Sequence, residues 1–193
     1  MRWLLAALVA LALVATGCQA DRAPQGGGGV DVDTPELRAV KAQAGIAPCA
    51  APTGPKAEGG LPDVTLPCLG GGDGVDLARL RGPMVVNLFA QWCKPCREEL
   101  PHYQAFHEKY GDRVAVLGVD WQDTQPLNAL RLARETGVTY PLLADPDPQV
   151  RARGLPRLLL VDDQGRVAFD EYVEITSLHQ LEDIVAEHLG VHP

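Results

Sequence analysis

Hydrophobic and polar positions follow two different periods across residues 84–110. Residues 84–89 form an almost continuous apolar run, which is typical of a strand buried on both faces of a sheet. After residue 94 the apolar side chains recur every three or four positions, as on one face of an amphipathic helix. These side chains are Leu100, Tyr103, Phe106 and Tyr110. The pattern predicts a central strand followed directly by a helix.

Similar patterns predict further elements before and after this pair. A helix over 34–45 has Thr34 as its cap, Pro35 in its first turn and Gly45 at its end. Downstream we expect a strand at 114–119, a helix at 125–136, a strand at 142–144 with a helical turn after it, a hairpin with its turn at 163–165, and a helix at 177–189. This order predicts an α/β fold on a mixed central sheet.

The first residues predict export. An apolar run from Trp3 to Ala15 follows a single basic residue, and it is short and ends in small residues, as in a secretory signal rather than a spanning helix. The sequence Ala-Thr-Gly-Cys at its end resembles the bacterial lipoprotein box. That resemblance implies removal of residues 1–17 and a lipid anchor on Cys18, which would hold the protein on the extracytoplasmic face of the cell membrane. A secreted protein with a stray cysteine is the alternative.

Composition changes after the signal. Residues 18–57 are rich in glycine and proline, and we interpret them as a flexible tether and N-terminal extension ahead of a domain at 58–193. Hydrophobic residues make up 46% of the chain and charged residues 22%, as in a soluble globular protein. The formal net charge of −8 gives no support for a nucleic-acid partner.

The number of cysteines limits the ways in which they can pair. If Cys18 carries lipid, four cysteines remain in an oxidising compartment, and they allow three connectivities. Pairing Cys93 with Cys96 leaves Cys49 with Cys68 and no odd thiol. The sequence favours a structural role for the second pair. Closing the loop between these two cysteines would stabilise the folded chain by about 3 kcal/mol. A second redox pair that relays electrons to the first is the alternative.

The spacing of Cys93 and Cys96 also provides half of a tetrahedral zinc site. The other half should be another CxxC or a paired histidine motif, and the sequence contains neither. We therefore predict no metal site, and copper or zinc handling remains the alternative function for these thiols.

The position of the CxxC motif favours redox chemistry. Cys93 lies where the strand ends and the helix begins, so the amide groups and the positive dipole end of the helix stabilise its thiolate, and Lys94 adds a neighbouring positive charge. Cys96 lies one turn further on the same face, close enough to form a disulfide.

The motif Trp92-Cys93-Lys94-Pro95-Cys96 after a buried strand resembles the thioredoxin active site. The longer sequence "VVNLFAQWCKPCREELP" resembles the membrane-anchored TlpA-like and ResA-like thiol–disulfide oxidoreductases of bacterial envelopes. The resemblance covers about residues 58–190. It implies a thioredoxin fold with a TlpA-like insertion, an attacking and partly exposed Cys93, and a buried, resolving Cys96.

Other site residues are implied by the same resemblance. Glu99 matches the acidic residue of the CxxCxxExP pattern and implies a proton-transfer group, whereas the alternative is a solvated residue beside Glu98. Asn87 stands where thioredoxin has a buried aspartate. Pro156 matches the cis-proline that faces the disulfide. Arg157 departs from the small polar residue usual after that proline, which leaves the partner preference open.

We expect an enzyme that exchanges thiols and disulfides with protein substrates through a mixed disulfide, with no cofactor besides its own redox-active disulfide. The family resemblance implies a reductase fed by a membrane electron donor, in cytochrome c assembly. We expect the protein to be a monomer. A disulfide-forming oxidase is an alternative, since spacing does not fix direction. A peroxidase would need a threonine one turn before its cysteine, which "NLFAQWCKPC" lacks.

Overall fold

The computed structural model describes residues 29–49, 51–52 and 54–191. The expected signal at 1–17 and the expected lipid anchor Cys18 lie outside the described residues. Within the described ranges no helix combines the length and the apolar character needed to cross a bilayer.

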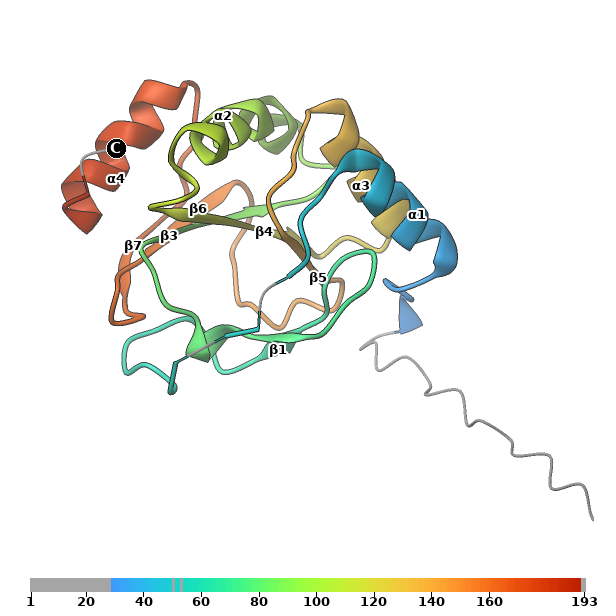
Figure 1. Cartoon of the computed structure of the whole chain (residues 1–193), viewed down its shortest axis with the longest axis horizontal. Helices are drawn as coiled ribbons and strands as arrows, with labels where there is room; N and C mark the ends of the chain where they lie inside the picture. The colour runs from blue at the N-terminus through green and yellow to red at the C-terminus, as the bar shows by residue number, and fades with distance from the viewer. Residues whose placement is uncertain (1–28, 50, 53, 192–193) are drawn as a thin grey trace, which may run out of the picture.

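A five-stranded mixed sheet forms the centre of the molecule (Figure 1), with the strand order β5-β4-β3-β6-β7. Parallel pairing joins β3 to β4 and β4 to β5, and antiparallel pairing joins β3 to β6 and β6 to β7. The strands are β3 (Met84–Phe89), β4 (Ala115–Trp121), β5 (Leu142–Asp145), β6 (Arg157–Val161) and β7 (Val167–Glu171). A separate two-stranded sheet pairs β1 (Thr65–Leu66) with β2 (Val75–Asp76).

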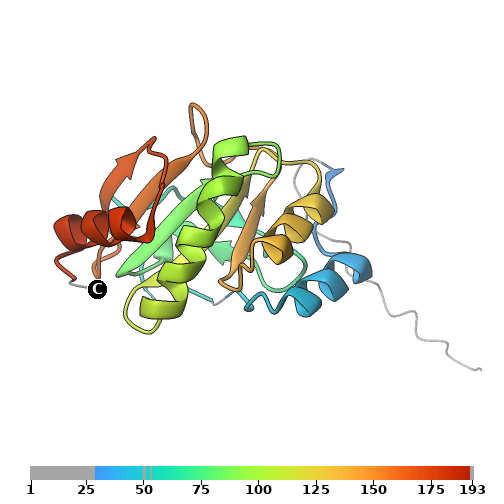
Figure 2. The ribbon, with the colours of Figure 1, turned by 90° about the horizontal axis from the view of Figure 1, so that it is seen from above.

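The helices gather against one face of the central sheet, as Figures 1 and 2 show. They are α1 (Pro35–Ala44), α2 (Lys94–Tyr110), α3 (Pro126–Glu135) and α4 (Leu178–Leu189). Both α2 and α3 are crossover helices that connect a strand to its parallel neighbour across the same face of the sheet. A mixed sheet with these helices is the thioredoxin fold that the sequence predicts.

Two hydrophobic cores lie on opposite faces of the sheet. Alternate residues of β3 supply both: Val85 and Phe89 belong to the core under the helices, whereas Val86 and Leu88 belong to the other. No α-helix of the described chain contributes to the second core, which is completed by the segment before β3 that carries β1, β2 and a short 3-10 helix at Leu77–Arg79. Buried members from that segment are Leu61, Leu66, Val75, Leu77 and Leu80.

The N-terminal helix α1 is part of the helical layer. Thr34 caps it by accepting a hydrogen bond from the Leu37 amide (3.2 Å), and Gly45 ends it in the left-handed region at φ 71°. Leu37 and Ile46 are buried in the same core as α3. The segment between α1 and β1 is therefore held to the domain at its start by apolar packing.

Most predicted elements are confirmed within a few residues, including β3, α2 and the hairpin of β6 and β7. The prediction of a helical turn after the strand at 142–144 is wrong. The Asp145 side chain instead accepts hydrogen bonds from the amides of Gln149 and Val150, both at 2.9 Å. In a helical turn these two amides would donate to backbone carbonyls of the turn. Because the Asp145 side chain accepts their hydrogen bonds instead, residues 146–150 form a loop.

Candidate active site

Cys93 and Cys96 form a disulfide at the junction of β3 and α2, with their Cα atoms 5.3 Å apart. Cys93 is the N-cap of α2, and its Sγ accepts a hydrogen bond from the Cys96 amide at 3.3 Å. That amide and the positive end of the helix would both stabilise a Cys93 thiolate in the reduced protein. The helix therefore activates one particular sulfur of the pair.

The two sulfurs differ in exposure in the expected order. Cys96 is fully buried, and Cys93 is 5% exposed. The partly exposed thiol that the resemblance implies is thus only narrowly open in the disulfide form. The neighbouring Trp92 is 52% exposed, and its indole N–H donates to the Gln122 carbonyl at 3.3 Å. Trp92 presents an aromatic face beside Cys93, the more exposed sulfur of this pair.

Lys94 contributes less to the site than its position in the sequence indicates. Its side chain is 87% exposed, and its ammonium lies 3.7 Å from the Glu98 carboxylate. Solvent and this ion pair screen its charge, so its effect on Cys93 is weak. The helix terminus remains the main source of positive potential at the sulfur.

Glu99 is buried rather than solvated: it is 2% exposed, and its carboxylate accepts a hydrogen bond from the Ile175 amide at 2.6 Å. Burial raises the pKa of Glu99 to about 8, although the Ile175 amide opposes that shift. On helix α2, Glu99 is three residues from Cys96 and so shares its face. Glu99 holds a proton at neutral pH beside the more deeply buried thiol.

A buried polar cluster accompanies Glu99 under α2. Tyr103 and Tyr140 are fully enclosed, and burial, the largest cause, raises the pKa of each phenol, with Glu99 adding to the shift. Asn87 is 2% exposed, and its side chain lowers the pKa of the Tyr140 hydroxyl, against the effect of burial. Asn87 carries no titratable proton, so Glu99 is the one group of this cluster that exchanges a proton near neutral pH.

The Leu155–Pro156 peptide bond is cis. The next residue, Arg157, pairs with Leu88 across β3 and β6, so Pro156 lies at the end of β3 from which the CxxC motif continues. The sequence did not indicate a second cis bond, which joins Gly82 to Pro83.

Arg157 is held by its own hairpin and by the loop before it. Its guanidinium binds Asp170 through two hydrogen bonds of 2.7 Å and donates a third to the Arg151 carbonyl, also at 2.7 Å. The side chain is only 12% exposed. The unusual residue after the cis-proline is therefore held in place by its hydrogen bonds and is not a free cation.

Two acidic residues beside the motif were missed from the sequence. Asp120 pairs with Phe89 across β3 and β4, and it is 1% exposed. Asp123 accepts hydrogen bonds from the Gln91 amide (3.0 Å) and the Gln125 amide (2.8 Å). Burial raises the pKa of Asp120 well above its ordinary value, and Asp123 adds to the rise. The available signal was the polar end of β4, because parallel strands end at the same sheet edge.

Beside the motif lies a pocket of about 180 Å³ between α2 and α3, lined by Gln91, Arg97, Asn128, Arg131, Leu132 and Glu135. Across the described ranges, no three histidine, cysteine or acidic side chains gather as a metal site would require. The chemistry available here is that of the two sulfurs and the buried acids.

The second predicted pair is also a disulfide, with the Cα atoms of Cys49 and Cys68 5.9 Å apart. Cys68 pairs with Leu143 of β5 in an isolated bridge. The disulfide lies on the β5 side of the sheet, whereas the CxxC motif follows β3.

Comparisons with solved structures agree with the observed fold. The chain is similar to a secreted disulfide oxidoreductase of Mycobacterium tuberculosis homologous to Escherichia coli DsbE, with a TM-score of 0.54 and 20% identity over 65% of this chain and 96% of that one. It is also similar to a DsbF homologue from Corynebacterium diphtheriae, with a TM-score of 0.57 and 25% identity over 74% of this chain and 99% of that one.

Curated relatives share the region around the motif. The chain is 30% identical over 117 residues to the thiol:disulfide interchange protein DsbE of Allochromatium vinosum, covering 56% of this chain and 63% of DsbE. It is 35% identical over 88 residues to the thiol:disulfide interchange protein HelX of Rhodobacter capsulatus, covering 43% of this chain and 48% of HelX. The match spans less than two thirds of either relative. A family model described as AhpC/TSA matches residues 59–169, more than half of the sequence, and the chain therefore belongs to the AhpC/TSA family.

Proposed function

We propose that the protein is a thiol–disulfide oxidoreductase that reduces disulfides in other proteins. The observation that carries the proposal is the asymmetric disulfide at the start of α2, in which Cys93 is reachable and helix-stabilised while Cys96 is enclosed. The names of the relatives, DsbE, HelX and the thiol-disulfide oxidoreductase ResA of Geobacillus thermodenitrificans, describe this class of reaction.

In the proposed reaction the Cys93 thiolate attacks one sulfur of a substrate disulfide. The bond between the substrate sulfurs breaks, a mixed disulfide forms on Cys93, and the second substrate sulfur leaves as a thiolate. Cys96 then attacks Cys93, which releases the reduced substrate and restores the disulfide of the enzyme. Two electrons pass from the enzyme dithiol to the substrate.

Glu99 is proposed to handle the proton of Cys96. Cys96 must lose its proton before it attacks, and it is enclosed in apolar surroundings that raise a thiol pKa. Glu99 has a pKa of about 8 and shares a helix face with Cys96, so near neutral pH it is able to take up and release a proton beside that thiol. The raised pKa of the buried Glu99 supports this role over that of a solvated surface acid.

Substrate contact is proposed at Trp92 and Pro156. Trp92 is one of the few large apolar side chains exposed in the described chain, and it stands next to Cys93. Pro156 ends the neighbouring loop, and the guanidinium of Arg157 beside it is held by Asp170. An extended protein segment with apolar groups near its disulfide suits this surface.

The direction of transfer is tested by the redox state of Cys93 and Cys96 in intact cells. We expect a reduced pair when cells are quenched with acid and their thiols are alkylated, because a reductase must be kept reduced by an electron donor, proposed to lie in the membrane. Chains carrying Cys93→Ser/Cys96→Ser calibrate the mass shift. An oxidised pair at steady state would refute the reductase direction and support an oxidase.

We further propose that residues 1–17 are removed and that the mature chain is a monomer anchored by lipid on Cys18. The proposal keeps 18–57 as the tether and extension of the domain at 58–193. Cytochrome c assembly is the setting that the family resemblance suggests. The support for the anchor is the apolar run that ends in Thr-Gly-Cys.

A Cys18→Ala variant is expected to leave the membrane fraction, since the lipid is the proposed attachment. Fractionation of expressing cells, followed by detection of the protein in membrane and soluble fractions, measures the change. Cys49→Ala, which removes a different N-terminal cysteine, serves as the control and should stay with the membrane. Retention of Cys18→Ala at the wild-type level would rule out the anchor.

A further inference from the structure

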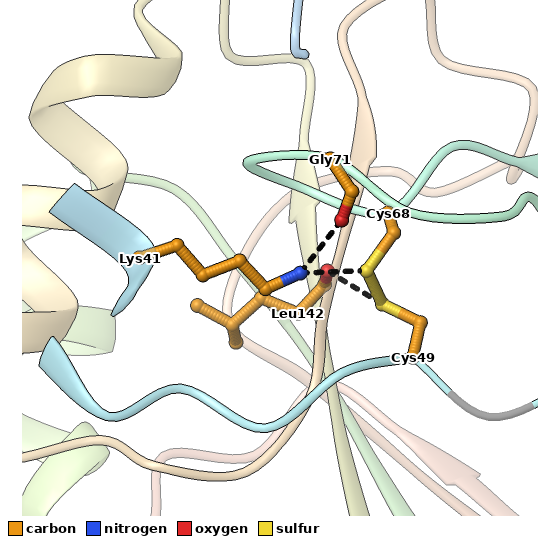
Figure 3. Close-up of a disulfide and its surroundings, with 5 residues drawn as sticks. All are labelled: Lys41, Cys49, Cys68, Gly71 and Leu142. Atoms are coloured by element: carbon orange, nitrogen blue, oxygen red, sulfur yellow. Dashed lines mark hydrogen bonds between the residues drawn. A yellow bond between two sulfur atoms is a disulfide. The ribbon is translucent and has the colours of Figure 1, made fainter. Parts of the chain in front are cut away.

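A buried lysine donates a hydrogen bond to one sulfur of the second disulfide. The Lys41 Nζ, from helix α1, lies 2.9 Å from the Cys68 Sγ and 2.9 Å from the Gly71 carbonyl oxygen, as Figure 3 shows. Lys41 is 8% exposed and Cys68 is 1% exposed. An ammonium group enclosed against a disulfide sulfur is not needed for a purely mechanical crosslink.

Lys41 has no direct ionic partner among the described residues. No carboxylate in that part of the chain forms an ion pair with it, and Asp33, whose charge acts on Lys41 without contact, is bound by Arg38 at 2.6 and 2.9 Å. Burial lowers the pKa of Lys41, with Asp33 opposing the shift. A negative charge on the neighbouring sulfur would therefore be stabilised by a desolvated cation.

A glycine turn closes over this contact. Gly70 has a φ of +74° and Gly71 a φ of +94°, a left-handed backbone that other residues rarely adopt. A Cβ on Gly70 would lie 3.0 Å from the Lys41 Cβ. The turn thus brings the Gly71 carbonyl and Cys68 to the same ammonium, which orients it toward the sulfur.

The two sulfurs of the disulfide face opposite kinds of group. Cys68 Sγ faces the Lys41 donor, which favours a thiolate, whereas Cys49 Sγ lies 3.3 Å from the Leu142 carbonyl oxygen, an acceptor that favours a protonated thiol. Cys49 is half-buried, so an external nucleophile reaches it before the enclosed Cys68. Exposure and electrostatics both make Cys49 the attacked sulfur and Cys68 the leaving one.

We propose that Cys49–Cys68 is a second thiol–disulfide exchange site that accepts electrons from a dithiol through Cys49. One thiolate of the dithiol attacks Cys49 Sγ, the Cys49–Cys68 bond breaks, and Cys68 leaves as a thiolate held by Lys41. The second thiol of the dithiol then attacks the mixed disulfide, so that the dithiol becomes a disulfide. Cys49 takes one of the two protons released and solvent takes the other.

This inference is independent of the proposed activity at Cys93 and Cys96, and it favours the redox alternative that the sequence left open for the second pair. The disulfide still closes a loop between residues 49 and 68. Its ease of reduction differs from that of an ordinary crosslink because a stabilised leaving thiolate favours the reduced form and departs faster.

The test uses the full chain with Cys93→Ser/Cys96→Ser, so that only the second pair exchanges. Buffers of reduced and oxidised dithiothreitol set the equilibrium, and peptide-resolved mass spectrometry after acid quench and alkylation gives the reduced fraction of Cys49 and Cys68. Adding Lys41→Met is expected to shift the equilibrium constant about tenfold toward the disulfide, because the reduced state loses its cation. Lys109→Met, which removes an exposed ion pair with Glu182, should leave it unchanged.

A second measurement keeps Lys41 intact and therefore decides the matter even if Lys41→Met does not fold. Brief exposure of the oxidised chain to glutathione is expected to give mixed disulfides on Cys49 and free thiol on Cys68. Adducts mainly on Cys68 would overturn the proposal. The proposal would also be overturned if the Lys41→Met chain folds and the equilibrium constant of its second disulfide is within twofold of that of its parent.

Discussion

A Cys96→Ser variant is expected to accumulate mixed disulfides on Cys93, while Cys93→Ser captures almost no partner. Cys93 has the helix terminus and the Cys96 amide to stabilise its thiolate, and it borders the exposed Trp92. Cys96 has no exposed surface, so a lone Cys96 thiol is out of reach of a partner. Non-reducing gels followed by peptide mapping measure the trapped species, and identification of the partners names the substrate class.

Two further variants sharpen the assignment. Pro156→Ala in the Cys96→Ser background changes the yield of trapped species without changing the cysteine that carries them, because Pro156 is a proposed substrate contact and supplies no sulfur. Cys93→Ser/Cys96→Ser gives the background of nonspecific capture. Equal capture by Cys93→Ser and Cys96→Ser would refute the role of Cys93 as the attacking thiol.

The free energy of unfolding is expected to fall as the pH rises from about 5 to about 9, in large part because of Glu99. Its pKa is about 8 in the folded chain against an ordinary 4.5, so the native state binds the extra proton between these values. The stabilising effect of that proton is complete below pH 4.5 and is lost as the pH rises through 8. The shift corresponds to on the order of 5 kcal/mol. Urea unfolding of the oxidised protein at several pH values measures the slope.

Glu99→Gln should flatten this pH dependence, since an amide keeps the shape of the side chain and cannot lose a proton. Glu98→Gln is the matched control, because Glu98 is exposed one residue away. Burial also raises the pKa of Asp120 and of Asp145, and these acids contribute a slope of the same sign in every variant. Identical slopes for Glu99→Gln and Glu98→Gln would show that Glu99 ionises as a surface acid.

The central strand and the helix after it were predictable because their periods are set by local geometry. Every residue of β3 is buried, and the apolar side chains of α2 line one face. Thr34 and Ser177 cap their helices through their own side chains, which is again a local effect. The loop after β5 was not predictable in this way, because the Asp145 side chain takes amides that a helical turn would otherwise use.

The site was only partly predictable. The spacing of the CxxC motif identifies Cys93 and Cys96, and the burial of Glu99 follows from its place on the inner face of α2. Asp123 holds the Gln91 amide across 32 positions of sequence, and only the pairing of β3 with β4 brings them together. Lys41 is a comparable case, since no local pattern relates it to a sulfur 27 residues away.

The cover on the face of the sheet opposite the α-helices constrains the order in which the molecule is completed. Leu61, Leu66 and Leu77 precede all five strands of the central sheet in the chain. During synthesis they emerge with no surface to cover until β3, β4 and finally β6 exist, so this core stays open until residue 161 is made. Its contacts are distant in sequence, and closing them comes late in folding. The apolar groups that seal this side are thus the first of the second core to be made and the last to be buried.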